Sequence, residues 1–226
     1  MASYGDIVLS YHDTLLRQTD VNTLEPGKWL NDNVISFWFD YLEHEVYAEY
    51  DSCVKFIAPD VAQFIKSAAE NSTQIEDVST VLESMELSKK KLLIIPINDS
   101  PTNAMTIGGT HWTLASFTID NGSFEHYDSF AGSVNHLHAQ SIFTVISPIL
   151  TPGRSIDIDL DFTEIPTTQQ RNNYDCGIHL ICNADAVCKK FLLGDERSIS
   201  EIASTEVVNK TRNELKVLIE QLKYKK

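Results

Sequence analysis

Hydrophobic positions in the first part of the chain recur at the spacing of helices. After Asn31-Asp32, which can cap a helix, apolar residues recur along VISFWFDYLEHEVY and predict a helix over that segment. Pro59-Asp60 opens a second predicted helix, VAQFIKSAAE, and a third is predicted from Ile75 to Met85. We therefore expect the first part of the chain to be mainly helical.

Further along, the pattern changes to short apolar runs that are typical of strands. Leu92 to Ile97 predicts a buried strand. His111 to Thr118 and Ser123 to Asp128 predict two more, joined in a hairpin around Asp120-Asn121-Gly122, because Asn-Gly is a strong turn sequence. A further strand is expected at Leu160 to Ile165.

Helices are predicted between and after these strands. They cover Val134 to Leu150, the largely apolar segment Cys176 to Phe191, and the amphipathic segment Glu206 to Leu222. Helices followed by strands, with a long apolar helix behind them, indicate an α+β domain. No repeat, low-complexity stretch or long linker divides the chain, so we expect a single domain over residues 1–226.

Composition indicates the class of protein and its surroundings. The 42% hydrophobic and 22% charged content is ordinary for a soluble globular domain. We find neither an apolar stretch long enough to cross a membrane nor a secretory signal. We therefore expect no membrane partner and a cytoplasmic and/or nuclear location, where the four cysteines stay free thiols.

The formal net charge of −14 bears on the choice of partner. A negative field repels nucleic acid, so nucleic acid is not expected as a partner. The charge favours a partner with a basic face, although solubility alone also accounts for it. We expect the protein itself to be a monomer.

Cys176 is the cysteine whose surroundings differ most from those of a buried structural thiol. It lies in the segment QQRNNYDCGIHL, after turn-forming Asn and Asp residues and at the predicted start of a helix. Unpaired N–H groups and the helix dipole at such a position stabilise the thiolate, which is the reactive form. Cys182 and Cys188 fall inside the apolar helix and fit a structural role. We interpret Cys176 as a nucleophile.

A nucleophilic thiol requires a base, and the chain has seven histidines. His111 opens a predicted strand, just before Trp112 and directly after the loop-forming segment Asn98 to Thr110, which ends in a Gly pair. His179 lies three positions along the helix from Cys176, shares a face with it and stays an alternative. Four others are most simply surface residues: His12, His44, His136 and His138.

Asp128 ends the strand next to that of His111 and is the candidate to orient the base. If Asn121-Gly122 were the centre of a two-residue turn, Asp128 would face Ala115, on the side of the sheet that His111 occupies but about 13 Å from it. Direct opposition requires a turn centred near Ile119-Asp120, or a bulge. The pattern favours the pairing and leaves the turn open.

Gln170 lies six positions before Cys176 in the same loop. Its side-chain amide can donate, beside the Cys176 backbone N–H, to the oxyanion that acyl transfer forms. A single glutamine in a polar loop is most simply a surface residue. Its place before a candidate nucleophile favours the catalytic interpretation.

Four motifs, in order along the chain, carry a family resemblance: WLNDNVISFW, GGTHW, HYDS and QRNNYDCG. With their His, Asp, Gln and Cys in that order, they resemble the proteases that process ubiquitin-like proteins, the sentrin or SUMO protease superfamily. Similarity runs from about Ile7 to the C-terminal helix, and VLSYHDTLLRQTDV and FIAPDVAQFIK resemble the deneddylating members in particular. One departure is Asn173, where many SUMO-directed members carry Gly.

The resemblance implies a papain-like fold, with a central mixed sheet and the nucleophile at the N-terminus of a buried helix. It implies cleavage after a C-terminal Gly-Gly by the triad His111, Asp128 and Cys176, with Gln170 at the oxyanion hole. A narrow slot walled by indoles suits such a tail, because the tail has no side chains. No cofactor and no metal are expected. The residues implied to hold the tail are Trp29, Asp32, Gly108, Gly109, Trp112 and Asn172.

The expected function is therefore that of a cysteine-type isopeptidase, with the neddylation modifier and its conjugates as partner. A SUMO-specific protease is the alternative, and an inactive module that binds such a modifier is a second one, which the intact set of four residues disfavours. The Asn98–Thr110 segment is a candidate to close over a bound tail. A metal site is disfavoured because its residues match no zinc spacing: His136, His138, Cys182 and Cys188.

Overall fold

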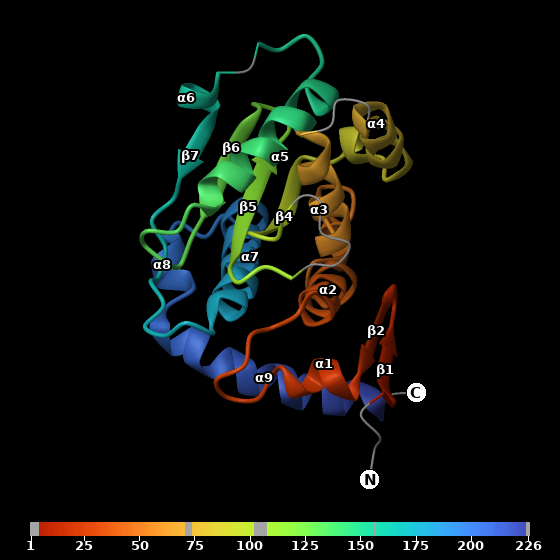
Figure 1. Cartoon of the computed structure of the whole chain (residues 1–226), viewed down its shortest axis with the longest axis vertical. Coiled ribbons are helices and arrows are strands. Elements are labelled where there is room, and N and C mark those ends of the chain that lie inside the picture. Colours follow the sequence, from red (N-terminus) through yellow and green to blue (C-terminus); the bar gives the residue numbers. More distant parts are fainter. Residues whose placement is uncertain (1–4, 71–73, 102–107, 156, 225–226) are drawn as a thin grey trace.

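A five-stranded sheet lies at the centre of the computed structural model, which describes residues 5–70, 74–101, 108–155 and 157–224 (Figure 1). In spatial order its strands are β3 (Val54–Phe56), β4 (Leu92–Asn98), β5 (Trp112–Thr118), β6 (Ser123–Tyr127) and β7 (Phe162–Glu164). The three middle strands are antiparallel neighbours, whereas β3 pairs in parallel with β4 and β7 with β6. The sheet is therefore mixed, as the papain-like fold requires.

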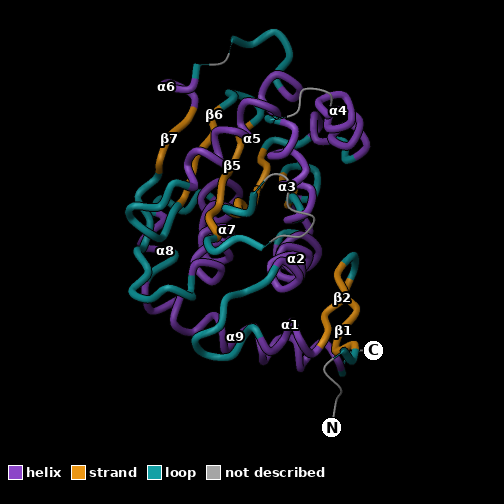
Figure 2. The backbone as a smooth tube through the Cα atoms, in the orientation of Figure 1, coloured by secondary structure: helices purple, strands orange, loops and turns teal. Residues whose placement is uncertain are grey.

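Helices surround the sheet, and a two-stranded hairpin lies apart from it (Figure 2). The hairpin consists of β1 (Ile7–Tyr11) and β2 (Thr14–Arg17) and packs beside the second and ninth helices. The helices are α1 (Gln18–Asn22), α2 (Asp32–Tyr41), α3 (Pro59–Ala68), α4 (Ile75–Ser84), α5 (Asn135–Leu150), α6 (Ile158–Asp161), α7 (Cys176–Leu193), α8 (Ile199–Ile202) and α9 (Thr205–Lys223). Shorter helical turns are η1 (Leu42–Val46), η2 (Ala48–Tyr50) and η4 (Leu87–Lys89).

Strands β4 and β5 are buried on both faces, which explains their continuous apolar sequences. Ile94 and Leu114 belong to the core that α7 shares, whereas the alternate residues Ile95 and Phe117 belong to the core of α3 and α5. Helix α7 therefore covers one face of the sheet, and α3 and α5 cover the other (Figure 1). This layering packs α7 directly against β5.

The α+β prediction is confirmed, as is a buried helix that begins at Cys176. The predicted cap at Asn31 is also present, since its side chain accepts from the N–H of Val34. Most predicted helices and strands are found within a few residues of the expected bounds.

Three elements differ in detail from the predicted ones. The first part of the chain also contains the strands β1, β2 and β3, which the helical pattern did not predict. The first long helix leaves α geometry at Tyr41 and continues as a π-helical turn over Leu42–Val46. The strand expected at Leu160 to Ile165 begins as α6 and is a strand only at Phe162–Glu164, because only those residues pair with the edge of β6.

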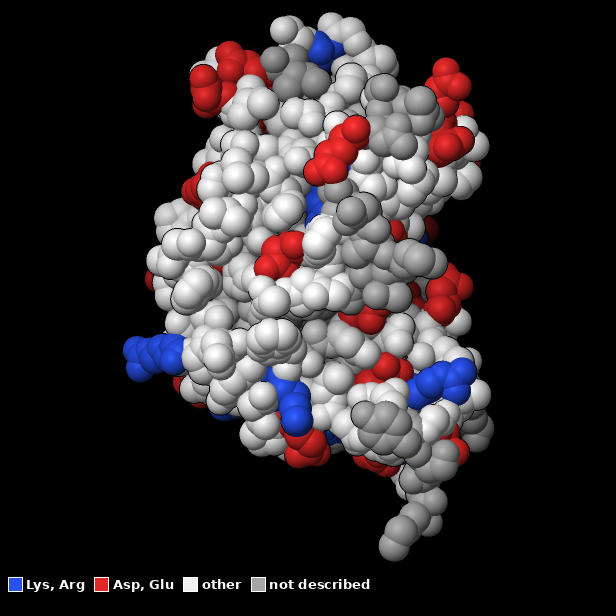
Figure 3. All heavy atoms as spheres, viewed as in Figure 1, with Lys and Arg blue, Asp and Glu red and all other residues white. Residues whose placement is uncertain are grey.

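Surface charge follows the composition. Figure 3 shows Asp and Glu side chains over the whole height of one face, with Lys and Arg at few places. In the part of the chain that the structure describes, no helix combines the length and the apolar character needed to cross a membrane.

Candidate active site

His111 and Asp128 meet where β5 begins and β6 ends. Nε2 of His111 lies 2.7 Å from Oδ1 of Asp128. Thr118 pairs with Ser123 at the closed end of the hairpin, so residues 119–122 form the loop. This register falls between the two turns considered from the sequence, and the two side chains span the remaining offset.

The pair is electrostatically coupled. Burial alone would lower the pKa of His111, but hydrogen bonds and charge from Asp128 and Cys176 raise it to about 9. Burial alone would raise the pKa of Asp128, but hydrogen bonds from His111, Ser133 and the Phe130 backbone hold it below its ordinary value. The site therefore favours a charged imidazolium beside a carboxylate.

The backbone of His111 has a support of its own. Oδ1 of Asp99 accepts from the N–H of His111 at 2.9 Å and from that of Thr110 at 2.5 Å. Beneath Asp99, the fully buried Lys66 donates to the carbonyls of Asn98 at 2.6 Å and Ser100 at 2.7 Å. Burial lowers the pKa of Lys66 to about 8.

Sequence reasoning missed both of these supports. Lys66 follows Ala62 by one helical turn on the buried face of α3. A lysine among the apolar residues of that face is the signal that could have identified it. Asp99 lies among other turn-forming polar residues and has no such signal.

Cys176 is the first residue of α7, and its thiol lies close enough to the imidazole of His111 to raise the pKa of that ring. The side chain is buried, with 1% exposure. Gly177 allows α7 to start against Leu30, because a Cβ at position 177 would lie 2.8 Å from Cβ of Leu30. Burial lowers the pKa of His179 to about 4, and it is His111 whose pKa the thiol of Cys176 raises.

The other cysteines differ from Cys176 in their surroundings. Burial raises the pKa of Cys182 to about 12 and the pKa of Cys188 well above its ordinary value. Both thiols therefore stay protonated and unreactive at neutral pH. Cys53 is half-buried, and all four cysteines are free.

Gln170 lies in the loop before Cys176, where the oxygen and the nitrogen of its side-chain amide both form hydrogen bonds. Its Oε1 accepts from Oγ of Ser129 at 2.9 Å, and its Nε2 donates to the carbonyl of Asn172 at 2.7 Å. An amide nitrogen carries two protons, so one N–H of Gln170 is left for a further acceptor. The side-chain oxygen of Asn172 accepts the N–H groups of Tyr174 and Asp175, both at 3.0 Å, so this residue shapes the loop.

Four of the six residues expected to hold a tail line one cleft of about 190 Å³: Trp29, Asp32, Gly109 and Trp112. Trp112 is 6% exposed and its indole N–H donates to the carbonyl of Leu30 at 3.1 Å. Trp29 is 48% exposed and its indole N–H donates to the carbonyl of Asn173 at 2.6 Å. One indole is thus a fixed wall and the other is open to solvent.

The other two residues, Gly108 and Asn172, do not line this cleft. The N–H of Gly108 donates to Oγ of Ser100 at 2.6 Å, at the edge of the Asn98–Thr110 segment. Asn172 lies in the loop before Cys176, as described above. Residues 102–107 lie outside the described residues, so closure of the Asn98–Thr110 segment stays a prediction.

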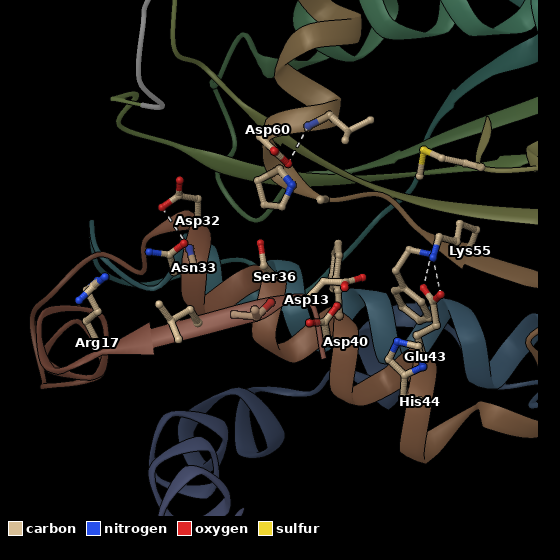
Figure 4. A pocket seen from close by; sticks show the side chains of 18 residues that line it. Asp13, Arg17, Asp32, Asn33, Ser36, Asp40, Glu43, His44, Lys55 and Asp60 are labelled. Atoms are coloured by element: carbon tan, nitrogen blue, oxygen red, sulfur yellow. Dashed lines mark hydrogen bonds and ion pairs between the residues drawn. The ribbon is translucent and has the colours of Figure 1, made fainter. Parts of the chain in front are cut away.

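A larger cavity of about 630 Å³ adjoins the cleft and shares Asp32 with it. Figure 4 shows carboxylates of the hairpin, of α2 and of α3 around it. Lys55, which is paired with Glu43, and Arg17 also line the cavity, so carboxylates outnumber the two cations in its lining. The acidic residues are Asp13, Asp32, Asp40, Glu43 and Asp60.

The described residues offer no evident set of ligands for a metal ion. Within the described ranges, no three His, Cys, Asp or Glu side chains are grouped as metal ligands would be. The group considered from the sequence is split between the polar start of α5, with His136 and His138, and the interior of α7, with Cys182 and Cys188.

A reactive thiol at the start of a buried helix, paired with an imidazole at the end of a mixed sheet, defines a cysteine peptidase of papain-like fold. The chain belongs to the Ulp1 protease family: residues 28–223 match the C-terminal catalytic domain of that family, Peptidase_C48. The enzyme class and the family expected from the motifs are confirmed.

Relatives cover nearly the whole chain. It is 38% identical to human Sentrin-specific protease 8 over 216 residues, which cover 96% of this chain and 97% of that protein. It is 32% identical to NEDD8-specific protease 1 of Arabidopsis thaliana over 228 residues, with coverages of 97% and 95%.

A solved structure of the yeast Ulp1 protease domain in complex with Smt3, the yeast ortholog of SUMO, superposes with a TM-score of 0.70. It is 19% identical and covers 98% of this chain and 90% of its own. This likeness shows that the fold is the papain-like one.

Proposed function

We propose that this peptidase cleaves after the C-terminal Gly-Gly of a ubiquitin-like modifier, and that the modifier is the neddylation modifier. The observation that carries the proposal is the cleft between Trp29 and Trp112. Leu30 lines this cleft and also touches the start of α7, so the cleft adjoins Cys176. A narrow slot with indole walls admits an extended chain that lacks side chains and excludes bulkier ones.

The relatives support the choice of modifier. The chain is similar over almost its full length to human Sentrin-specific protease 8 and to a plant protease named for NEDD8. We therefore propose the neddylation modifier as the substrate, in its precursor form, in conjugates with other proteins, or in both.

The chemistry follows from the arrangement of His111, Asp128 and Cys176. Because Nε2 of His111 is bonded to Asp128, Nδ1 is the ring nitrogen left to face the thiol. The Cys176 thiolate attacks the carbonyl of the last glycine, and His111 protonates the leaving amine to give a thioester. His111 then takes a proton from water, which hydrolyses the thioester. Asp128 keeps the imidazole in this tautomer.

The tetrahedral intermediate requires donors for its oxyanion. The second N–H of Gln170 and the backbone N–H of Cys176 are the two groups we assign to this task. Ser129 and Asn172 hold the Gln170 amide in place from both ends. Gln170 thus acts as a donor that is oriented before the substrate arrives.

The acidic cavity beside the cleft suits the folded part of a modifier with basic side chains. It shares Asp32 with the cleft, so a tail in the cleft places the body of the modifier against the cavity. Carboxylates of the β1–β2 hairpin, α2, η1 and α3 surround it (Figure 4). Electrostatic attraction of this kind raises association rates and declines with salt.

The free thiols support a reducing cell compartment. All four cysteines are free, and the candidate nucleophile must remain reduced to react. We therefore propose that the protein works in the cytoplasm, the nucleus or both, as a single catalytic domain over residues 1–226.

Hydrolysis of fluorogenic C-terminal amides of the neddylation modifier, SUMO and ubiquitin tests the choice of substrate. We expect kcat/KM for the neddylation modifier to exceed that for the other two by about 100-fold or more. A preference for SUMO would support the SUMO-specific alternative. Tight binding of a modifier without hydrolysis would support the inactive-module alternative.

A further inference from the structure

The guanidinium of Arg212, in the middle of α9, meets two loops that are remote in sequence. Its Nη1 donates to the carbonyl of Thr23 at 2.8 Å and to that of Glu25 at 3.3 Å. Its Nη2 donates to Oδ1 of Asp175 at 2.5 Å. The side chain is 13% exposed, so this ion pair is largely screened from solvent.

One of these loops runs directly into the nucleophile. Asp175 precedes Cys176 at the start of α7, and its carboxylate does not cap that helix. Its two oxygens are used instead by Arg212 and by Nδ2 of Asn172, the latter at 2.7 Å. The carbonyl of Asn172 in turn accepts from Gln170. A continuous chain of hydrogen bonds thus runs from α9 to the amide that we assign to the oxyanion.

The other loop leads to the open wall of the tail cleft. Thr23 and Glu25 lie between α1 and Trp29, and their carbonyls point at Arg212. The indole N–H of Trp29 donates to the carbonyl of Asn173, which lies in the loop before Cys176. The two loops are therefore tied together twice, once by Arg212 and once by the Trp29 indole.

The geometry of the guanidinium explains why an arginine occupies this position. Its planar fork presents donors in two directions at once, so one arm serves the carbonyls and the other serves the carboxylate. The guanidinium also lies 5.9 Å from the centroid of the Tyr174 ring. A lysine at position 212 has a single charged nitrogen and cannot reproduce both arms.

We propose that Arg212 is a positioning residue that holds the Trp29 wall of the tail cleft in register with Cys176 and the oxyanion loop. The proposal rests on the proposed function, because the register matters for a substrate that occupies the cleft and the nucleophile together. A small reagent that attacks the thiol alone does not depend on it. This difference separates a positioning role from a purely structural one.

The chain offers a matched control on the same helix. Lys216 lies one turn further along α9 and pairs with Oε1 of Glu25 at 2.9 Å, with 31% exposure. It is a cation bonded to the same loop, but it makes no bond to Asp175 or Tyr174 among those of the described residues. Lys216→Met therefore removes a charge from α9 without cutting the bridge to the nucleophile.

The test compares two reagents on Arg212→Met, Arg212→Lys, Lys216→Met and the wild type. One is the neddylation modifier with a C-terminal electrophile, and the other is iodoacetamide. We expect Arg212→Met to react about 100-fold more slowly with the modifier reagent and less than about threefold more slowly with iodoacetamide. Arg212→Lys should fall between it and the wild type, and Lys216→Met should match the wild type.

An unchanged ratio of the two rates in Arg212→Met would overturn the proposal, because a structural role lowers both rates together. Thermal unfolding shows whether the variant is folded, and Arg212→Lys decides the matter if Arg212→Met is not. A wild type that reacts with iodoacetamide but with no modifier reagent would contradict the proposed function instead.

Hydrogen exchange tests the bridge without any modifier. In Arg212→Met we expect faster exchange in residues 23–30 and in residues 170–175, with the β5–β6 hairpin unchanged. Exchange that stays at the wild-type rate in either loop would contradict the bridge, whichever modifier the enzyme cleaves.

Discussion

Two supports meet at the site, the open end of the β5–β6 hairpin and the start of α7. On the hairpin, His111 and Asp128 are 17 residues apart, and strand pairing brings them together. On the helix side, the loop before Cys176 is held by Arg212, 37 residues from Asp175, and by Trp29, 144 residues from Asn173.

The difference between these supports shows how the candidate active site is built. The base and its carboxylate are brought together by local structure, the pairing of β5 with β6, and Asp99 adds a further support to the His111 backbone. The nucleophile and the tail cleft are placed relative to each other by tertiary contacts between distant loops. Changes on the hairpin should therefore alter the chemistry, and changes in the loops should alter how the tail is presented to it.

The largest expected effect is on the hairpin side. Asp128→Asn should lower kcat/KM by about 100- to 10,000-fold, because the imidazole loses the partner that fixes its tautomer. The exposed Asp120→Asn, in the loop of the same hairpin, should leave kcat/KM unchanged. A loss of less than about threefold in Asp128→Asn would contradict the assigned role.

The same variant has a pH signature. The pKa of His111 is raised from 6.5 to about 9, so its charged form contributes stability that is complete below about pH 6.5 and is lost as pH rises through about 9. We expect kcat/KM of the wild type to fall as pH rises through about 9. In Asp128→Asn the fall should begin at lower pH, because one cause of the raised pKa is removed.

A smaller effect is expected where the hairpin meets the Asn98–Thr110 segment. A Cβ at Gly109 would lie 2.1 Å from Oδ1 of Asn98 and 2.2 Å from Oδ1 of Asp99. Gly109→Ala should therefore displace Asp99 from the His111 backbone and lower kcat/KM by about 10- to 100-fold. Gly5→Ala is the control, since a Cβ there meets nothing within 4 Å. Wild-type kinetics in Gly109→Ala would show that the Asp99 support is dispensable.

The smallest expected effect on turnover separates the two indoles. Trp29→Ala should raise KM by about tenfold with little change in Tm, because the side chain is half exposed and forms one wall of the cleft. Trp112→Ala should instead lower the free energy of unfolding by about 3–5 kcal/mol, because that indole is buried. Equal destabilisation by the two substitutions would contradict the distinction between an open and a fixed wall.

Local patterns in the sequence predicted the hairpin side well. The apolar runs of β4 and β5 and the turn residues between β5 and β6 are short-range features, and they were enough to bring Asp128 to His111. The exact register was not predicted, because a four-residue loop and a two-residue turn suit the same residues. The start of α7 was predicted because turn-forming residues precede an apolar run there.

The tertiary supports could not be predicted in the same way. Asp99 and Arg212 look like ordinary surface residues until the loops that they join are placed side by side. β3 has three residues and exists because β4 offers it an edge, and the β1–β2 hairpin is held by packing on α9 and α2. Such features depend on long-range contacts that leave no periodic pattern in the sequence.

The most direct test of the central claim is to locate the covalent adduct. The protein is incubated with the neddylation modifier that carries a C-terminal electrophile, digested, and analysed by mass spectrometry for the residue that bears the modifier tail. The account predicts one adduct, on Cys176, and no adduct in Cys176→Ala. An adduct on Cys53, or labelling that persists in Cys176→Ala, would contradict it.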